Sequence, residues 1–282
     1  MLDPLLAPFA LGFMRRALVG CLALSVAAPP LGVFLVLRRM SLMSDVLQHG
    51  VLPGIALGAI FAGLSVWAMG LGGVAAGLLV AVLAGWLARR TGGREDSQLA
   101  GMYLLALAAG VALISAQHSI DLTHLLFGSV LAVDNAALLG MAAVASLTLP
   151  VLALIWRPLV LESLDPGFMA ATAGRGGLWH LVFLMLVVLC VVSGFVALGT
   201  LMSVGLMMLP AIAARHWSDS LAGQVRVAVA LACLSSFGGL ELSFYLDIPA
   251  GPAIVLTAGS LWILSLLTGR HASLWHKAIT DA

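Results

Sequence analysis

Residues 46–88 have the sequence VLQHGVLPGIALGAIFAGLSVWAMGLGGVAAGLLVAVLAGWLA, which contains no Asp, Glu, Lys or Arg. As a single α-helix these 43 residues would be about 65 Å long, because each residue adds about 1.5 Å. The hydrocarbon core of a bilayer is about 30 Å thick and is crossed by about 20 helical residues. The stretch therefore predicts two membrane spans with a break near 63–65.

The whole chain has the same apolar character. Of its 282 residues 62% are hydrophobic and only 9% are charged, whereas soluble domains carry about 25% charged residues. Mean hydropathy is +1.14, and the net charge of +1 gives no indication of a nucleic-acid partner. The three cysteines lie singly in apolar runs, so neither a disulfide framework nor a thiolate metal site is indicated. We expect an all-α polytopic membrane protein with a single transmembrane domain over 1–282.

The other uncharged runs predict the remaining spans. They lie at 17–37, 97–116, 135–156, twice within 176–214 with a turn near 193–200, at about 222–242 and at 252–269. The total is nine transmembrane helices, or eight if 200–216 only re-enters the membrane. The mixed stretch 117–132, with Asp121 and His124, is expected at the interface or as a re-entrant segment, and 157–177 is the longest polar insertion.

The arginines predict the orientation. If the basic segment 89–94 is cytoplasmic, alternation of the spans places Arg38, Arg157, Arg215 and Arg270 on the same side, as the positive-inside rule requires. The N-terminus is then outside, together with Arg15 and its neighbour, against the rule.

The stretch 38–54 carries the strongest functional signal. Asp45 and His49 are four residues apart and therefore share one face of a helix. A carboxylate and an imidazole in this arrangement can bind one divalent cation. Pro53 has no N–H to donate to the carbonyl of His49, so the backbone there is loosened. Costly polar groups in a membrane segment often mark a transport pathway, although a helix cap at Asp45 and a histidine bonded to a backbone carbonyl would also explain the pair.

A short helix is predicted in the polar insertion. Asp165 suits the N-cap, Pro166 the first helical position and Gly174 the stop. Such an exposed helix, with Phe168 and Met169, either docks a soluble partner or rests on lipid. The residues of this predicted helix and its two ends are Asp165, Pro166, Gly167, Phe168, Met169, Ala170 and Gly174.

Two acidic residues, Glu241 and Asp247, lie near the turn that joins the last two predicted spans. They either attract cations to an outer mouth or are simply solvated. Enzymatic signatures are missing from the sequence: there is no P-loop motif, no H-E-x-x-H and no nucleophile elbow. Since Lys277 is the sole lysine, the chain is not expected to bind ATP in a P-loop.

Several motifs, in the same order along the chain, resemble those of one family of transporters. The sequence R-R-M-S followed by D-x-x-x-H-x-x-L-P-G resembles the hallmark of the permease subunits of ATP-binding cassette (ABC) importers for manganese, zinc and iron(II). Further matches to that family lie at 94–96, 121–128, 199–210 and 243–254. The resemblance covers nearly the whole chain.

The resemblance implies a type II ABC importer-like permease in a bacterial inner membrane. It implies a homodimer of permeases, two ATP-binding subunits that hydrolyse ATP, and an external solute-binding protein that delivers Zn²⁺ or Mn²⁺. No permanent cofactor is implied. Asp45 and His49 would hold the ion transiently, and the helix at 166–173 would couple to the ATPase. Gln48 departs from the family, which usually has Ser or Ala there; its amide either adds a ligand or narrows the passage.

Other functions remain open from the sequence. A proton-coupled secondary cation transporter would use Asp45 and Glu241 as a relay and would need no ATPase. A siderophore or vitamin ABC permease would have a related architecture but no need for Asp45 and His49. A membrane-embedded enzyme is disfavoured because no acid–base or nucleophile set converges. If the pair at Asp45 is only structural, the pathway is expected around Asp121, His124 and Glu241.

Overall fold

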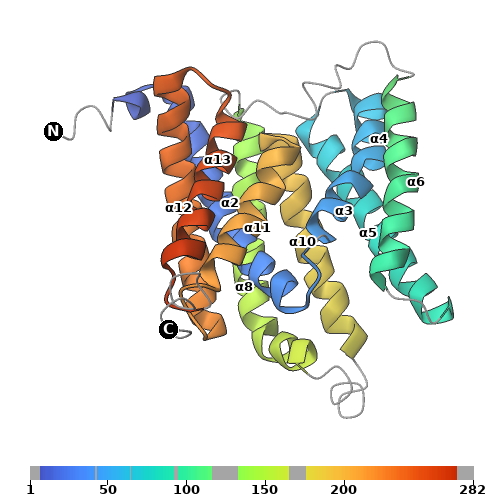
Figure 1. Ribbon diagram of the computed structural model, residues 1–282. Coiled ribbons are helices and arrows are strands. Elements are labelled where there is room, and N and C mark those ends of the chain that lie inside the picture. Colours follow the sequence, from blue (N-terminus) through green and yellow to red (C-terminus); the bar gives the residue numbers. More distant parts are fainter. Residues whose placement is uncertain are drawn as a thin grey trace.

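The computed structural model describes residues 7–41, 43–63, 65–91, 95–115, 133–164 and 176–271. Within these ranges the regular elements are all helices (Figure 1). Their bounds are η1 Pro8–Ala10, α2 Gly12–Leu37, α3 Met43–Gly50, α4 Leu52–Ala62, α5 Val66–Thr91, α6 Glu95–Ser115, α8 Asn135–Leu164, α10 Gly176–Leu198, α11 Thr200–Ala214, α12 Leu221–Leu246 and α13 Ala250–Thr268.

Seven segments of the described chain are long and apolar enough to cross a membrane, with α3 and α4 together forming one of them. Two shorter apolar helices, Ala100–Ser115 in α6 and Thr200–Ala214 in α11, occupy the positions of two further predicted spans. The all-α polytopic fold is therefore confirmed, and the helices agree with the predicted order of the spans.

Glycines make the two breaks that the lengths of the apolar runs predict. Gly63 separates α4 from α5 with a φ of +67°, and Gly199 separates α10 from α11 with a φ of +93°. Residues with a Cβ are strained at such angles, whereas glycine adopts them readily. Both long runs thus divide where the bilayer thickness requires it.

Two helices continue further than the sequence predicts. α8 was expected to end near 156 but extends to Leu164, through Arg157 and Glu162, so the first part of the predicted polar insertion is helical. α12 likewise continues through Glu241 to Leu246. A charged residue marks where a membrane span ends, but it does not end the helix, because the backbone hydrogen bonds persist in water. The predicted coupling helix (Asp165 to Gly174) and the residues Asp121 and His124 lie outside the described residues.

The helices pack in two groups that α10 connects. α4, α5 and α6 pack on one another, while α2 packs on α8, α11 and α12, and α10 contacts members of both groups. The approach of α4 to α5 is very close, since a Cβ on Gly54 would collide with the backbone carbonyl of Gly72. α2 and α12 are joined by a buried hydrogen bond of 2.8 Å between the hydroxyls of Ser25 and Ser236.

The two ends of the bundle match the two sides predicted from the charges. In Figure 1 η1 and the turn from α12 to α13 lie at the upper end. The end of α8, the start of α10, the start of α12 and the end of α13 lie at the lower end. Arg38, at the end of α2, contacts Glu162 near the end of α8, which places it at the lower end too.

Candidate metal-binding site

The site is built on α3, a helix of eight residues. Asp45 lies in its first turn and His49 in its last, positions that the helix dipole favours for an anion and for a cationic or polar ring. α4 starts at Leu52 with Pro53 in its first turn, where a missing N–H is tolerated. The carbonyl of His49 therefore receives no hydrogen bond from residue 53, and the segment changes from one helix to the next beside the histidine.

Asp45 and His49 face each other across one turn of α3. The Nε2 atom of His49 is 3.7 Å from Oδ1 of Asp45. The side chain of His49 is 26% exposed and that of Asp45 is 57% exposed. This separation is longer than a direct hydrogen bond. Metal bonds of about 2.1 Å to each atom together span up to about 4.2 Å, so one cation can contact both atoms without a change of rotamer.

The other ring nitrogen of His49 is not satisfied. Nδ1 is buried and has no hydrogen-bond partner among the described residues. The ring lies beside Tyr103 of α6, with centroids 5.7 Å apart and planes at 50°. Among the described residues, Nδ1 of His49 is therefore not bonded to a backbone carbonyl, which was the alternative explanation for this histidine.

Two further polar atoms on α3 are buried without partners in the described part of the chain: Oγ of Ser44 and Oε1 of Gln48. Gln48 is only 2% exposed. Ser44 and Gln48 are one turn apart and adjacent to Asp45 and His49, so α3 carries a contiguous polar stripe. An orphaned buried group costs about 1–3 kcal/mol, which a bound ion would offset. Ser44 is not among the site residues predicted from the sequence, although it lies four positions before Gln48.

The ligand set on α3 is small. Among the residues that the structure describes, no group of three or more His, Cys, Asp or Glu is placed to hold a metal ion. If Asp45 and His49 bind a cation, so small a set would suit transient binding, because an ion in a complete ligand cage would be released slowly.

The predicted mouth residues have different surroundings. Glu241 is buried within α12, and its Oε1 has no partner among the described residues. Asp247 is exposed and caps α12 in a left-handed conformation, with φ of +53°. Ser243 donates a hydrogen bond of 2.7 Å to the carbonyl of Ile248 and fixes this turn. The helices that pack on α3 are α4, α5, α6, α10 and α11, so the structure does not bring Glu241 and the α3 stripe into one site.

The family model for "ABC 3 transport family" matches residues 10–269 of this chain. The chain belongs to the ABC 3 transport family. The family, the fold class and the transport function predicted from the motifs are thereby confirmed, and this ABC 3 protein is the membrane permease of an ABC metal importer.

Individual relatives are similar over most of their length. The manganese import system permease protein ScaB of Streptococcus parasanguinis is 33% identical over 90% of this chain and 89% of its own. A probable iron transport system membrane protein of Haemophilus influenzae is 29% identical over 94% and 97%. The solved structure of PsaBC from Streptococcus pneumoniae in complex with Fab superposes with a TM-score of 0.84 at 27% identity, covering 96% of this chain and 98% of the other. The similarity therefore extends over most of the length of each of these proteins.

Proposed function

We propose that this permease imports Mn²⁺, and that Asp45 and His49 are the ligands that hold the ion midway through the membrane. The observation that carries the proposal is the pair on α3, with Nε2 and Oδ1 3.7 Å apart and open enough to admit a cation. The names of relatives such as ScaB and the manganese transport system membrane protein MntC of Halalkalibacterium halodurans support manganese. Zn²⁺ and Fe²⁺ are the competing cargoes, since an oxygen–nitrogen ligand pair also suits them.

The unpartnered oxygens of Ser44 and Gln48 complete the coordination in this proposal. Mn²⁺ prefers oxygen ligands, and neutral hydroxyl and amide groups add coordination without adding charge that would trap the ion. The chain then acts with a second copy of itself, two ATP-binding subunits and an external binding protein, in a bacterial inner membrane. The partners hydrolyse the ATP, and the segment from Asp165 to Gly174 docks against them.

The direct test is uptake of radioactive Mn²⁺, Zn²⁺ and Fe²⁺ by vesicles that contain the full complex with its binding protein. We expect Asp45→Ala and His49→Ala to reduce Mn²⁺ uptake by at least ~100-fold, because each removes half of the ionisable ligand pair. Assembly of the complex and its rate of ATP hydrolysis are measured in parallel, so that loss of folding is separated from loss of transport.

A second carboxylate–imidazole pair in the described chain supplies the matched control. His271 Nδ1, just after α13, lies 3.0 Å from Oδ2 of Asp219, just before α12, in an exposed position. Asp219→Ala and His271→Ala should leave uptake unchanged, since exposed ion pairs contribute little to stability. Normal Mn²⁺ uptake by His49→Ala would refute the ligand assignment, and uptake of Zn²⁺ alone by the wild type would refute the proposed cargo.

A further inference from the structure

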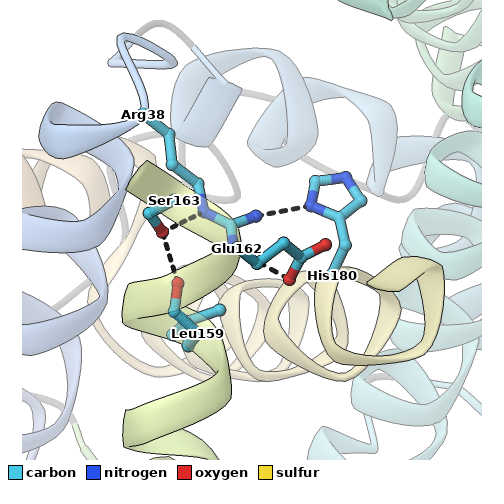
Figure 2. A network of polar contacts seen from close by, with 5 residues as sticks. All are labelled: Arg38, Leu159, Glu162, Ser163 and His180. Carbon is cyan, nitrogen blue, oxygen red and sulfur yellow. Dashed lines mark hydrogen bonds and ion pairs between the residues drawn. The ribbon is translucent and has the colours of Figure 1, made fainter. Parts of the chain in front are cut away.

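One arginine ties together three helix ends at the lower end of the bundle (Figure 2). Arg38 follows the last residue of α2. Its Nε donates to the hydroxyl of Ser163 at 2.9 Å, Nη2 donates to Glu162 at 3.1 Å, and Nη1 lies 2.7 Å from Nδ1 of His180. Glu162 and Ser163 are in the last turn of α8, and His180 is in the second turn of α10. We call these four residues the Arg38 cluster.

The Arg38 cluster is shielded from solvent. The side chains of Arg38 and Glu162 are only 8% and 11% exposed. The guanidinium also lies over the ring of Phe183, 5.1 Å from its centroid. Hydrogen bonds between ionised groups are about twice as strong as neutral ones, and a planar guanidinium fixes its partners in direction. The cluster is therefore a stiff joint and not a loose surface ion pair.

The bonding pattern fixes the role of each partner. Arginine has donors only, so Nδ1 of His180 accepts. Ser163 accepts from Arg38 and donates to the carbonyl of Leu159 at 2.6 Å, which directs its lone pair toward the guanidinium. Glu162 supplies the negative charge. Lysine has a single ammonium group and cannot reproduce this set of directions.

The position of the joint in the chain connects two functional regions. Glu162 and His180 lie on the two sides of the segment 165–175, which is proposed to contact the ATP-binding subunits. Arg38 lies five residues before Met43, where α3 begins, and α3 carries Asp45 and His49. Arg38 thus contacts residues on both sides of the segment 165–175, and it lies close in sequence to the start of α3.

We propose that the Arg38 cluster is the mechanical link by which movement of α8 and α10 at the partner-facing end is passed to α3, so that ATP hydrolysis is coupled to a change at the metal site. Arg38 is a positioning residue that touches neither metal nor nucleotide. The proposal rests on the proposed function. It predicts that breaking the joint separates hydrolysis from transport, whereas a purely structural role would reduce both together.

The test measures Mn²⁺ transported per ATP hydrolysed by the full complex in proteoliposomes. The variants are Arg38→Gln, Arg38→Lys and Ser163→Ala, and the control is Arg226→Gln. Arg226 is an exposed arginine whose Nε donates only within its own helix, to the carbonyl of Ala222. We expect both Arg38 variants to lower the transport ratio by at least ~10-fold, while the ATPase rate stays within about twofold of wild type.

Ser163→Ala removes one contact and should lower the same ratio by about two- to fivefold, which keeps the test meaningful if the Arg38 variants fail to assemble. The inference is overturned if the ratio is unchanged in Ser163→Ala and in the assembled Arg38 variants, or if transport and hydrolysis fall in parallel. Failure of the proposed function would look different, because the wild-type complex itself would then not take up Mn²⁺.

Discussion

The side chain of Gln48 is unfavourable for stability but is suited to bind a ligand. It is almost completely buried, and its amide oxygen has no partner among the described residues. Ser44 and Asp45 lie one turn before it on the same helix. A group in this position destabilises the protein without a ligand and contributes binding energy with one.

Gln48→Leu is therefore expected to change stability and transport in opposite directions. Removing the amide that has no partner should raise the free energy of unfolding of the metal-free permease by about 1–3 kcal/mol. The KM for Mn²⁺ uptake should rise about tenfold, because an oxygen ligand is lost. Thermal unfolding in detergent and uptake kinetics measure the two effects. Gln224→Leu is the control, since Gln224 donates to the carbonyl of Ser218 at the far end of α12. An unchanged KM in Gln48→Leu would show that the amide is not a ligand.

The sequence was sufficient to predict Asp45 and His49 as a pair, because a spacing of four is a property of the helix alone. It was not sufficient for the Arg38 cluster. Arg38 and Glu162 are 124 residues apart, and their contact depends on how α2, α8 and α10 pack. Similarly, the burial of Ser44 is decided by neighbouring helices and not by the residues beside it.

At the level of the elements, the contact between α4 and α5 depends on glycine. Gly54 and Gly72 lie so close that each Cβ would collide with the other's backbone. Membrane helices gain packing contacts in this way, since no hydrophobic effect drives them together inside lipid. The contact also supports α3, because α4 begins two residues after α3 ends.

Gly54→Ala should therefore separate α4 from α5 and destabilise the permease by about 1–3 kcal/mol, the usual range for overpacking. Gly70→Ala provides a matched control in α5, because a Cβ at Gly70 meets nothing within 4 Å. This control should be neutral or stabilising by up to ~1 kcal/mol through helix propensity. Thermal unfolding in detergent measures both variants, and equal stability of the two would contradict the close packing.

Element boundaries were predictable where the bilayer sets them. The breaks at Gly63 and Gly199 follow from runs too long for one crossing. The uncharged run predicts a span over 135–156, but α8 continues to Leu164, because Arg157 ends the apolar run and not the helix. The last two turns of α8 bring Glu162 and Ser163 into contact with Arg38. This contact joins distant parts of the chain, so the local sequence does not reveal it.

For the molecule as a whole, the distribution of arginines predicts one orientation in the membrane. The end of α8, the start of α12 and the end of α13 share one end, whereas η1 and the turn from α12 to α13, which contains Asp247, share the other (Figure 1). Positively charged ends remain cytoplasmic during insertion. The turn at Asp247 is therefore expected outside, and the start of α12 inside.

Cysteine labelling tests this orientation. Asp247 and Asp219 are both exposed and lie at opposite ends of α12. In right-side-out vesicles an impermeant maleimide should label Asp247→Cys at once and Asp219→Cys only after permeabilisation. Wild-type protein gives the background, since Cys21 and Cys190 are buried and Cys233 lies within α12. Immediate labelling of Asp219→Cys alone would reverse the orientation.

The hydrogen bond between Ser25 and Ser236 also has a consequence for biosynthesis. Its two hydroxyls are separated by 211 residues, so the ribosome synthesises and delivers almost the whole permease before the contact can form. Until α12 is inserted, Ser25 of α2 lacks its contact with Ser236. The contacts of Ser25 with Ser236 and with the carbonyl of Ala232 are therefore among the last to form, and a chain that ends before α12 lacks both of them.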